Sequence, residues 1–299
     1  MIRVRQAESD ADLEAWGRVK RAVLPNESAW TPEAFRERAE PERLVLVAEL
    51  DGEIVGAGIA GRSDIVGRGF VAPRVHPDAR RRGVGTALLF RLAEHVQSLG
   101  LEDVWGSADD PGSCAFAERF GFEEVDREVE QVKMLGDEPS PPSPLPDGVE
   151  VVTIAERPEL LGETYPLAAA EGYADLAVEG DVVIELDDWL RDEATLPEGS
   201  FVALSDGEII GYSGLMRHDN PGTAEDGLTV VARSWRRRGL ARALKERELA
   251  WAAANGIREV VTWTQRGNES MRTVNERLGY VYRSVGVKMM ASLPLRSPE

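Results

Sequence analysis

The sequence predicts an α+β fold, a mixed and mainly antiparallel sheet flanked by helices, and it predicts this fold twice in one chain. Both halves of the 299 residues contain alternating strands joined by an Asp-Gly turn. Both also contain an arginine- and glycine-rich turn that precedes a helix. Asp51 and Asp206 are 155 residues apart, and Gly83 and Gly239 are 156 apart. Such a shared register indicates a tandem duplication.

The first half begins with elements that local patterns predict clearly. Residues 2–5 alternate as in a strand, and helices are expected at about 10–23 and after Thr31-Pro32, where threonine caps and proline fits the first turn. Residues 44–58 predict a hairpin, because Asp51-Gly52 can adopt the positive φ angles of its tight turn.

The remaining elements of the first half surround the glycine turn. A strand at about 69–75 precedes the turn, and a strand at 103–106 and a helix at about 113–120 come later. The helix between them ends before Gly100, and its apolar positions share one face: Leu88, Leu89, Leu92, Ala93, Val96 and Leu99.

The second half repeats this order after a proline-rich segment. The segment 137–148 contains five prolines, which favour an extended, semi-rigid linker. A hairpin around Asp206-Gly207, a strand at 228–231 and a helix at about 240–255 follow. We therefore expect domains at 1–136 and 149–299, joined by that linker.

The glycine turns predict a phosphate-binding site. Backbone N–H groups at a helix start are unpaired and face the positive end of the helix dipole, and arginines add charge-assisted hydrogen bonds. The alternative, an arginine-rich solvated face or nucleic-acid patch, is disfavoured by the net charge of −18. The expected binding residues are Val75, Arg80, Arg81, Arg82, Gly83, Val84, Gly85 and Thr86 in the first copy, and Val230, Val231, Arg236, Arg237, Arg238, Gly239, Leu240, Ala241 and Arg242 in the second.

Composition narrows the classes of partner and compartment. The acidic chain is expected to repel nucleic acid and anionic lipid and to favour cationic amines. No run reaches the roughly 18 apolar residues of a membrane span, and the amino terminus lacks an apolar signal core. Cys114 is the single cysteine, which fits a reducing cytoplasm, and the three histidines lack metal-ligand spacing.

Both halves resemble the GNAT acyltransferase superfamily, whose signature is Arg or Gln, two free positions, Gly, one free position, then Gly or Ala. Arg80, Gly83 and Gly85 match it in the first copy, and in the second the matching residues are Arg236, Gly239 and Ala241. The resemblance implies two tandem GNAT folds that bind acetyl-CoA as co-substrate, with no metal.

The family's later motif is well preserved only in the second copy. By resemblance, Asn268 and Asn275 there hold the CoA arm. The first copy lacks both asparagines, and it is the more degenerate of the two. Many family members carry a tyrosine as general acid where this chain has Ala117 and Asn275, so the resemblance assigns no general acid to either copy.

The expected activity is transfer of an acetyl group from acetyl-CoA to a primary amine of a small molecule. The amine must first lose a proton, and Glu225 and Asp226, which precede the second glycine-turn strand and point in opposite directions if it is regular, are the candidate bases. A main-chain amide near Val230 or Val231 would hold the oxyanion. Tyr280 and Tyr212 are candidates to protonate the leaving thiolate.

Several alternatives stay open at the level of sequence. The protein is either an enzyme, or a non-catalytic acyl-CoA-binding or regulatory protein, or it acetylates protein amino groups. Acceptor recognition is expected from the variable segments 25–43 and 165–197, and the chain is either a monomer forming an internal pseudo-dimer or a homodimer. The second segment has an acidic lip that suits a cationic amine or merely aids solubility: Glu171, Tyr173, Asp175, Glu179, Asp181, Glu185, Asp187 and Asp188.

Overall fold

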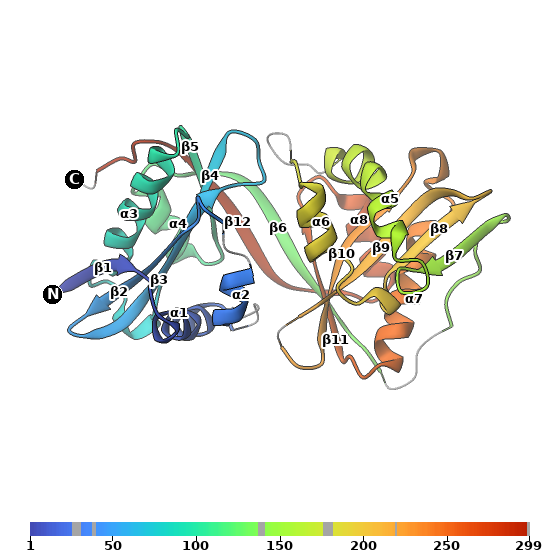
Figure 1. Ribbon diagram of the computed structural model, residues 1–299, viewed down its shortest axis with the longest axis horizontal. Coiled ribbons are helices and arrows are strands. Elements are labelled where there is room, and N and C mark those ends of the chain that lie inside the picture. Colours follow the sequence, from blue (N-terminus) through green and yellow to red (C-terminus); the bar gives the residue numbers. More distant parts are fainter. Residues whose placement is uncertain (26–30, 38–39, 137–140, 176–181, 219, 298–299) are drawn as a thin grey trace. The chain divides into compact units, whose positions relative to one another are not determined.

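The computed structural model describes residues 1–299 except 26–30, 38–39, 137–140, 176–181, 219 and 298–299 (Figure 1). The helices are α1 (Asp10–Val23), α2 (Pro32–Glu37), α3 (Val84–Ser98), α4 (Pro111–Glu118), α5 (Glu159–Leu167), α6 (Leu186–Asp192), α7 (Leu240–Ala254) and α8 (Glu269–Arg277). The strands are β1 (Ile2–Gln6), β2 (Leu44–Leu50), β3 (Glu53–Arg62), β4 (Arg68–Val75), β5 (Asp103–Ala108), β6 (Glu123–Met134), β7 (Val149–Thr153), β8 (Phe201–Ser205), β9 (Glu208–Arg217), β10 (Thr223–Val231), β11 (Glu259–Gln265) and β12 (Val281–Ser292).

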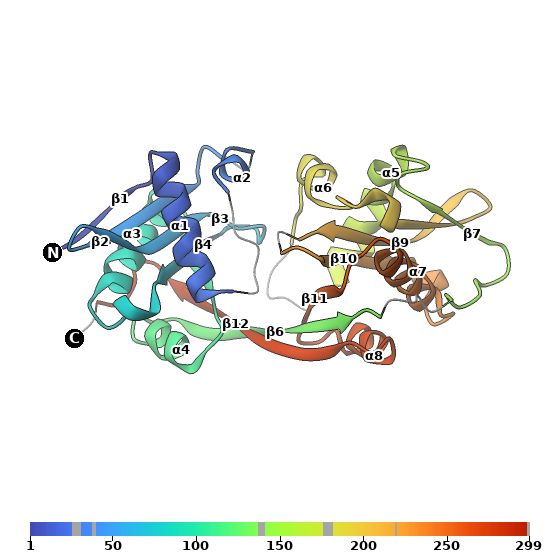
Figure 2. The same cartoon turned by 90° about the horizontal axis from the view of Figure 1, so that it is seen from below.

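The chain packs into two compact units that do not coincide with its sequential halves. Unit 1 contains residues 1–126 and 286–299, and unit 2 contains residues 127–285. The chain passes from one unit to the other within β6 and again within β12, the two long strands seen clearly in Figure 2. Of the linker expected at 137–148, residues 137–140 lie outside the described part of the chain.

Unit 1 contains a sheet in the order β1-β2-β3-β4-β5-β12. Only β4 and β5 pair in parallel, and the other neighbours are antiparallel. The sheet is thus mixed and mainly antiparallel, as the sequence predicts. The hairpin turn is confirmed, because Asp51 and Gly52 have φ values of 53° and 92°. Ser9 caps α1 and forms a capping box with Asp12, which fixes where that helix begins.

Unit 2 repeats this arrangement in the order β6-β11-β10-β9-β8-β7, with β10 and β11 as its parallel pair. Asp206 and Gly207, with φ values of 51° and 83°, form the equivalent hairpin turn. The α+β fold and its repetition are therefore confirmed.

Each unit contains a strand from the opposite end of the repeat. In unit 1, residues 287–292 of β12 pair with β5, and in unit 2, residues 128–134 of β6 pair with β11. The last strand of each sequential copy thus completes the sheet of the other. The sequence register of the repeat contains no information about this exchange.

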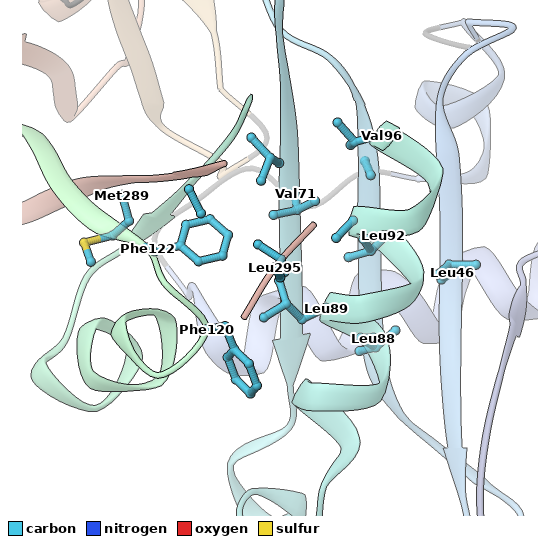
Figure 3. Close-up of a cluster of buried hydrophobic side chains, with 14 of the residues drawn as sticks. Leu46, Val71, Leu88, Leu89, Leu92, Val96, Phe120, Phe122, Met289 and Leu295 are labelled. Carbon is cyan, nitrogen blue, oxygen red and sulfur yellow. The ribbon is translucent and has the colours of Figure 1, made fainter. Parts of the chain in front are cut away.

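Each sheet is covered on both faces by helices. In unit 1, α1 and α2 bury Trp16 and Phe35 against one face, while α3 packs Leu88 and Leu92 against the other (Figure 3). In unit 2, α5 and α6 pack on one face around Trp189, and α7 packs Leu244 on the other. These apolar cores hold the ends of the two parallel strand pairs in place.

Candidate active site

Each glycine turn presents backbone N–H groups at the start of a fifteen-residue helix. In unit 1, Arg81 (φ 62°) and Gly83 (φ 86°) are left-handed before α3, and in unit 2 Arg237 (φ 64°) and Gly239 (φ 84°) match them before α7. Within the described residues, no side chain accepts a hydrogen bond at either helix start. Both turns therefore fit a phosphate group.

The first arginine of each turn braces the turn against its own strand. Arg80 Nε donates to the Val75 carbonyl at 3.3 Å, and Arg236 Nε donates to the Val231 carbonyl at 2.9 Å. The guanidinium groups thus shape the turn. The donors left facing a phosphate are mainly backbone amides.

Other side chains of the turns also have partners within the protein. Arg82 forms an ion pair with Asp51 at 2.9 Å in unit 1. In unit 2, Arg238 lies over the Trp235 ring at 4.6 Å, and Arg242 pairs with Glu246 at 2.7 Å. Their roles in binding CoA stay predictions.

In unit 2 the parallel strands β10 and β11 separate beside the glycine turn. They pair only from Thr223 to Glu225, although β10 continues to Val231. The Ala232 amide donates to β9, and because backbone groups alternate along a strand, the amides of Val231 and Thr229 point away from β9. The amide of Val230 instead points toward β9. The candidate oxyanion donors are therefore Val231, which was predicted, and Thr229, which was not.

Unit 1 has the same separation but a different donor set. Its strands β4 and β5 pair only from Arg68 to Phe70. The His76 amide donates to β3. Because backbone groups alternate along a strand, the backbone nitrogens of Val75 and residue 73 point away from β3, toward the unpaired edge of β4. Residue 73 is proline, which has no N–H to donate. The first copy therefore lacks one of the two amides that the second copy offers.

A β-bulge in β10 decides which way the predicted carboxylates point. Asp226 is opposite Leu215 and Thr229 is opposite Ser213, so Gly227 and Leu228 together face one residue of β9. The extra residue reverses the alternation of side chains. Asp226 consequently faces α7 and is buried, whereas the half-buried Glu225 faces the opposite side of the sheet.

The structure brings together two of the predicted site residues, Asp226 and Tyr280. The Lys245 ammonium on α7 forms a buried ion pair with Asp226 Oδ2, and Tyr280 donates to the same oxygen at 3.1 Å. Burial and the neighbouring carboxylates raise the pKa of Tyr280 well above its usual value. Tyr280 therefore keeps its proton, and the Asp226 charge is already balanced by lysine.

The structure adds two carboxyl groups that the sequence analysis did not single out. Glu193, which follows α6, and Glu248 on α7 are both buried. Tyr212 donates to Glu193 Oε1 at 3.0 Å. Burial raises the pKa of Glu193 to about 7 and raises that of Glu248 well above its usual value. No motif marks these residues, since their proximity depends on the bulge and on helix packing.

Asn268 and Asn275 have partners inside unit 2. Asn268 Oδ1 caps α8 by accepting from the Met271 amide at 3.4 Å. Asn275 is fully buried, and its Nδ2 donates to Gln131 Oε1 on β6 at 3.0 Å. In the first copy, Asp110 caps α4 in the place of Asn268. Contact of either asparagine with CoA stays a prediction.

Among the described residues, no group of three or more His, Cys, Asp or Glu side chains is arranged to hold a metal ion. No helix within the described ranges is long and apolar enough to cross a bilayer.

Comparison with known sequences identifies relatives along nearly the whole chain. The sequence model of the acetyltransferase (GNAT) family matches residues 4–122 and 163–280. Mycothiol acetyltransferase of Catenulispora acidiphila is 28% identical over 295 residues, which cover 95% of this chain and 84% of that protein. Mycothiol acetyltransferase of Geodermatophilus obscurus is 30% identical over 259 residues, covering 82% of this chain and 81% of that protein.

Solved structures show the same fold repeated in tandem. A GCN5-related N-acetyltransferase from Sphaerobacter thermophilus superimposes with a TM-score of 0.78 at 22% identity and covers 97% of this chain and 95% of its own. A tandem GNAT protein from the clavulanic acid biosynthesis pathway gives a TM-score of 0.77 at 20% identity, with 98% of both chains covered.

Proposed function

Because the chain belongs to the acetyltransferase (GNAT) family, we propose that it transfers an acetyl group from acetyl-CoA to a primary amine of a small molecule. We assign the transfer to the second copy, residues 149–299, completed by the β6 strand. Relatives named mycothiol acetyltransferase support a small-molecule acceptor.

The edge of β10 carries this proposal. The amides of Thr229 and Val231 point away from β9 and directly precede the turn at Gly239. An acetyl-CoA whose pyrophosphate binds the turn would place its thioester along this edge, where fixed N–H groups can stabilise the oxyanion. Pro73 removes the matching donor from the first copy, which supports a binding or structural role there.

Binding of acetyl-CoA to each copy can be tested by calorimetry on Gly83→Trp and Gly239→Trp. Gly100→Trp and Gly256→Trp are matched controls, because these glycines also have positive φ, 76° and 80°, and lie at the opposite ends of the same two helices. We expect Gly239→Trp to abolish one binding event while Gly256→Trp leaves it. A wild-type chain that binds no acetyl-CoA would refute the proposal.

Turnover separates the enzyme from its alternatives. Release of CoA should be followed by mass spectrometry with glucosamine, tyramine, cysteine and spermidine, and with a lysine-containing peptide. Acetylated small amine is the expected product. Binding without any product would favour a non-catalytic acyl-CoA-binding protein, and acetylation of the peptide alone would favour a protein N-acetyltransferase.

A further inference from the structure

Glu193 is placed by an unusual piece of backbone. It follows α6 and precedes Ala194, whose φ of 51° is left-handed, a conformation that is sterically unfavourable for a non-glycine residue. The turn directs the Glu193 side chain over β9 and β10, on the face covered by α5 and α6. It belongs to the segment from which acceptor recognition was expected.

Two glycines make room for the Glu193 carboxylate. A Cβ atom on Gly214 of β9 would clash with Glu193 Oε1 and with the Tyr212 hydroxyl. A Cβ on Gly227, in the bulge of β10, would lie 2.6 Å from the same Glu193 oxygen. β9 and β10 therefore each have a glycine, without a side chain, where the Glu193 carboxylate lies against them.

Hydrogen bonds hold this carboxylate beside the candidate oxyanion donors. It accepts from the Tyr212 hydroxyl at 3.0 Å and from the backbone amides of Ala194 and Leu228. Leu228 immediately precedes Thr229, whose own amide points to the unpaired edge of β10. The carboxylate and the proposed carbonyl site are thus neighbours along one strand.

Glu193 forms no ion pair with a cationic side chain among the described residues. Tyr212 on β9 faces it directly, and Asp226 on β10 and Glu248 on α7 repel its charge. Lys245 is paired with Asp226 instead. Burial is the largest influence, and it raises the pKa of Glu193 to about 7. The ring of the buried Trp189 lies 5.4 Å from the ring of Tyr212.

The ring of Tyr173 packs edge-on against that of Trp189, with 6.2 Å between the ring centres. Tyr173 also helps to raise the pKa of Tyr212. A carboxyl group that titrates near neutrality in such surroundings can both accept a proton and release it at physiological pH.

We propose that Glu193 is the general base that removes a proton from the ammonium group of the acceptor, an inference that rests on the proposed acetyl transfer. The proton moves to the carboxylate, and the neutral nitrogen attacks the thioester carbonyl carbon. The oxyanion forms against the amides of Thr229 and Val231. As the C–S bond breaks, the second nitrogen proton passes through solvent to the departing sulfur, and Glu193 then releases its proton to water.

The two carboxylates predicted from sequence are less suited to this step. Asp226 points to the α7 face, where its Oδ2 atom pairs with Lys245 and accepts from Tyr280. Glu225 lies on the far side of the bulge from Thr229 and pairs with β9 opposite Met216. Glu193 alone among these three bonds directly to the residue that adjoins Thr229.

The test compares Glu193→Gln with Asp192→Asn, a neighbouring exposed carboxylate that pairs with Arg191. Glutamine can still accept from Tyr212, so the fold should be preserved, as circular dichroism would verify. We expect Glu193→Gln to lower kcat with the most active amine of the panel by about 10²- to 10⁴-fold. Asp192→Asn should stay within about twofold of wild type.

The pH dependence distinguishes a base from a structural residue. Wild-type kcat/KM should rise with pH through an apparent pKa near 7, and Glu193→Gln should lose this step. Trifluoroethylamine, whose nitrogen is largely neutral at pH 7, should recover much of the variant's lost rate. An equal loss for both amines at every pH would mean that Glu193 only supports the fold.

The outcomes also separate this inference from the function on which it rests. A wild-type protein that acetylates none of the amines overturns both. A wild-type protein that turns over, with a Glu193→Gln variant of similar rate, overturns only the assignment of Glu193. If the variant does not fold, a wild-type profile without any ionisation between pH 6 and 8 overturns it equally.

Discussion

Two buried carboxyl groups of unit 2 show how strongly the surroundings decide the behaviour of one functional group. Asp226 has the Lys245 ammonium beside it, so its charge is compensated within the buried core. Glu193 has a tyrosine hydroxyl and two amides, and repulsive carboxylates nearby. Hydrogen bonds alone offset only part of the cost of burying a charge.

Glu193→Gln should therefore change how stability depends on pH. The pKa of Glu193 is raised from 4.5 to about 7, so the folded state holds its proton more tightly than the unfolded state does. The contribution of Glu193 to wild-type stability is therefore fully present below pH 4.5 and is lost as the pH rises through about 7. Relative to wild type, the variant should gain about 2.5 kcal/mol between pH 5 and 8. Urea unfolding of both proteins at pH 5 and at pH 8 would measure these free energies. The same difference between variant and wild type at both pH values would contradict the prediction.

Lys245→Met should destabilise unit 2 strongly, because it leaves the Asp226 charge buried without a partner. The expected loss is about 3–5 kcal/mol. Arg242→Met, on the same helix, is the matched control, since its ion pair with Glu246 is about half exposed on the arginine side and should contribute less than about 1 kcal/mol. If chemical denaturation shows equal losses of unfolding free energy in the two variants, the buried pair stabilises the fold no more than the exposed pair does.

At the scale of elements, one strand differs between the copies in a way that bears on chemistry. The amide of residue 229 faces the unpaired edge of β10, and its counterpart in β4 is Pro73. Because neither position donates to its antiparallel neighbour, proline is compatible with the sheet there. The sequence contains this difference, but only the strand pairing shows which backbone groups it removes.

Thr229→Pro should leave the fold intact and lower acetyl transfer by about 10²- to 10³-fold, the effect of losing one oxyanion donor. Thr229→Ala is its control, because it removes the hydroxyl that bonds Ser213 but keeps the amide. Val230→Pro should instead disrupt β10, since that amide faces β9. Steady-state rates and melting temperatures of the three variants check this prediction, which fails if Thr229→Pro and Thr229→Ala have equal rates.

Some elements could be predicted from local sequence and others could not. The hairpins at Asp51-Gly52 and Asp206-Gly207 and the helix starts after Gly83 and Gly239 depend on φ angles that few residues adopt, so local chemistry specifies them. The bulge at Gly227 reverses side-chain direction without leaving a periodic signal. Glu193 and Asn275 meet their partners only through tertiary packing, which a one-dimensional pattern does not encode.

At the scale of the whole molecule, the two units share their strands. Residues 128–134 of the first copy complete the sheet of unit 2, and residues 287–292 of the second copy complete that of unit 1. Duplication explains why both copies have equivalent places for that strand. Each place is filled by the strand of the other copy.

Fragments 1–142 and 143–299 should therefore not fold when expressed separately, because β5 and β11 would each lose a paired strand and expose apolar edges. Co-expression should restore a soluble complex. The control is the intact chain with a protease site inserted after residue 138, cut after folding, which should keep its melting temperature. Two fragments that are each soluble, monomeric and cooperatively folded would contradict the exchange.

The exchanged strands also constrain how this protein can evolve. A duplicated gene normally leaves one copy free to be deleted once its chemistry is dispensable. Here, deletion of residues 1–136 would remove the β6 residues Gln131 and Glu130, which bond Asn275 and Arg283 in unit 2. Selection on the second copy alone is then enough to preserve β6, whatever chemistry the rest of the first copy has lost.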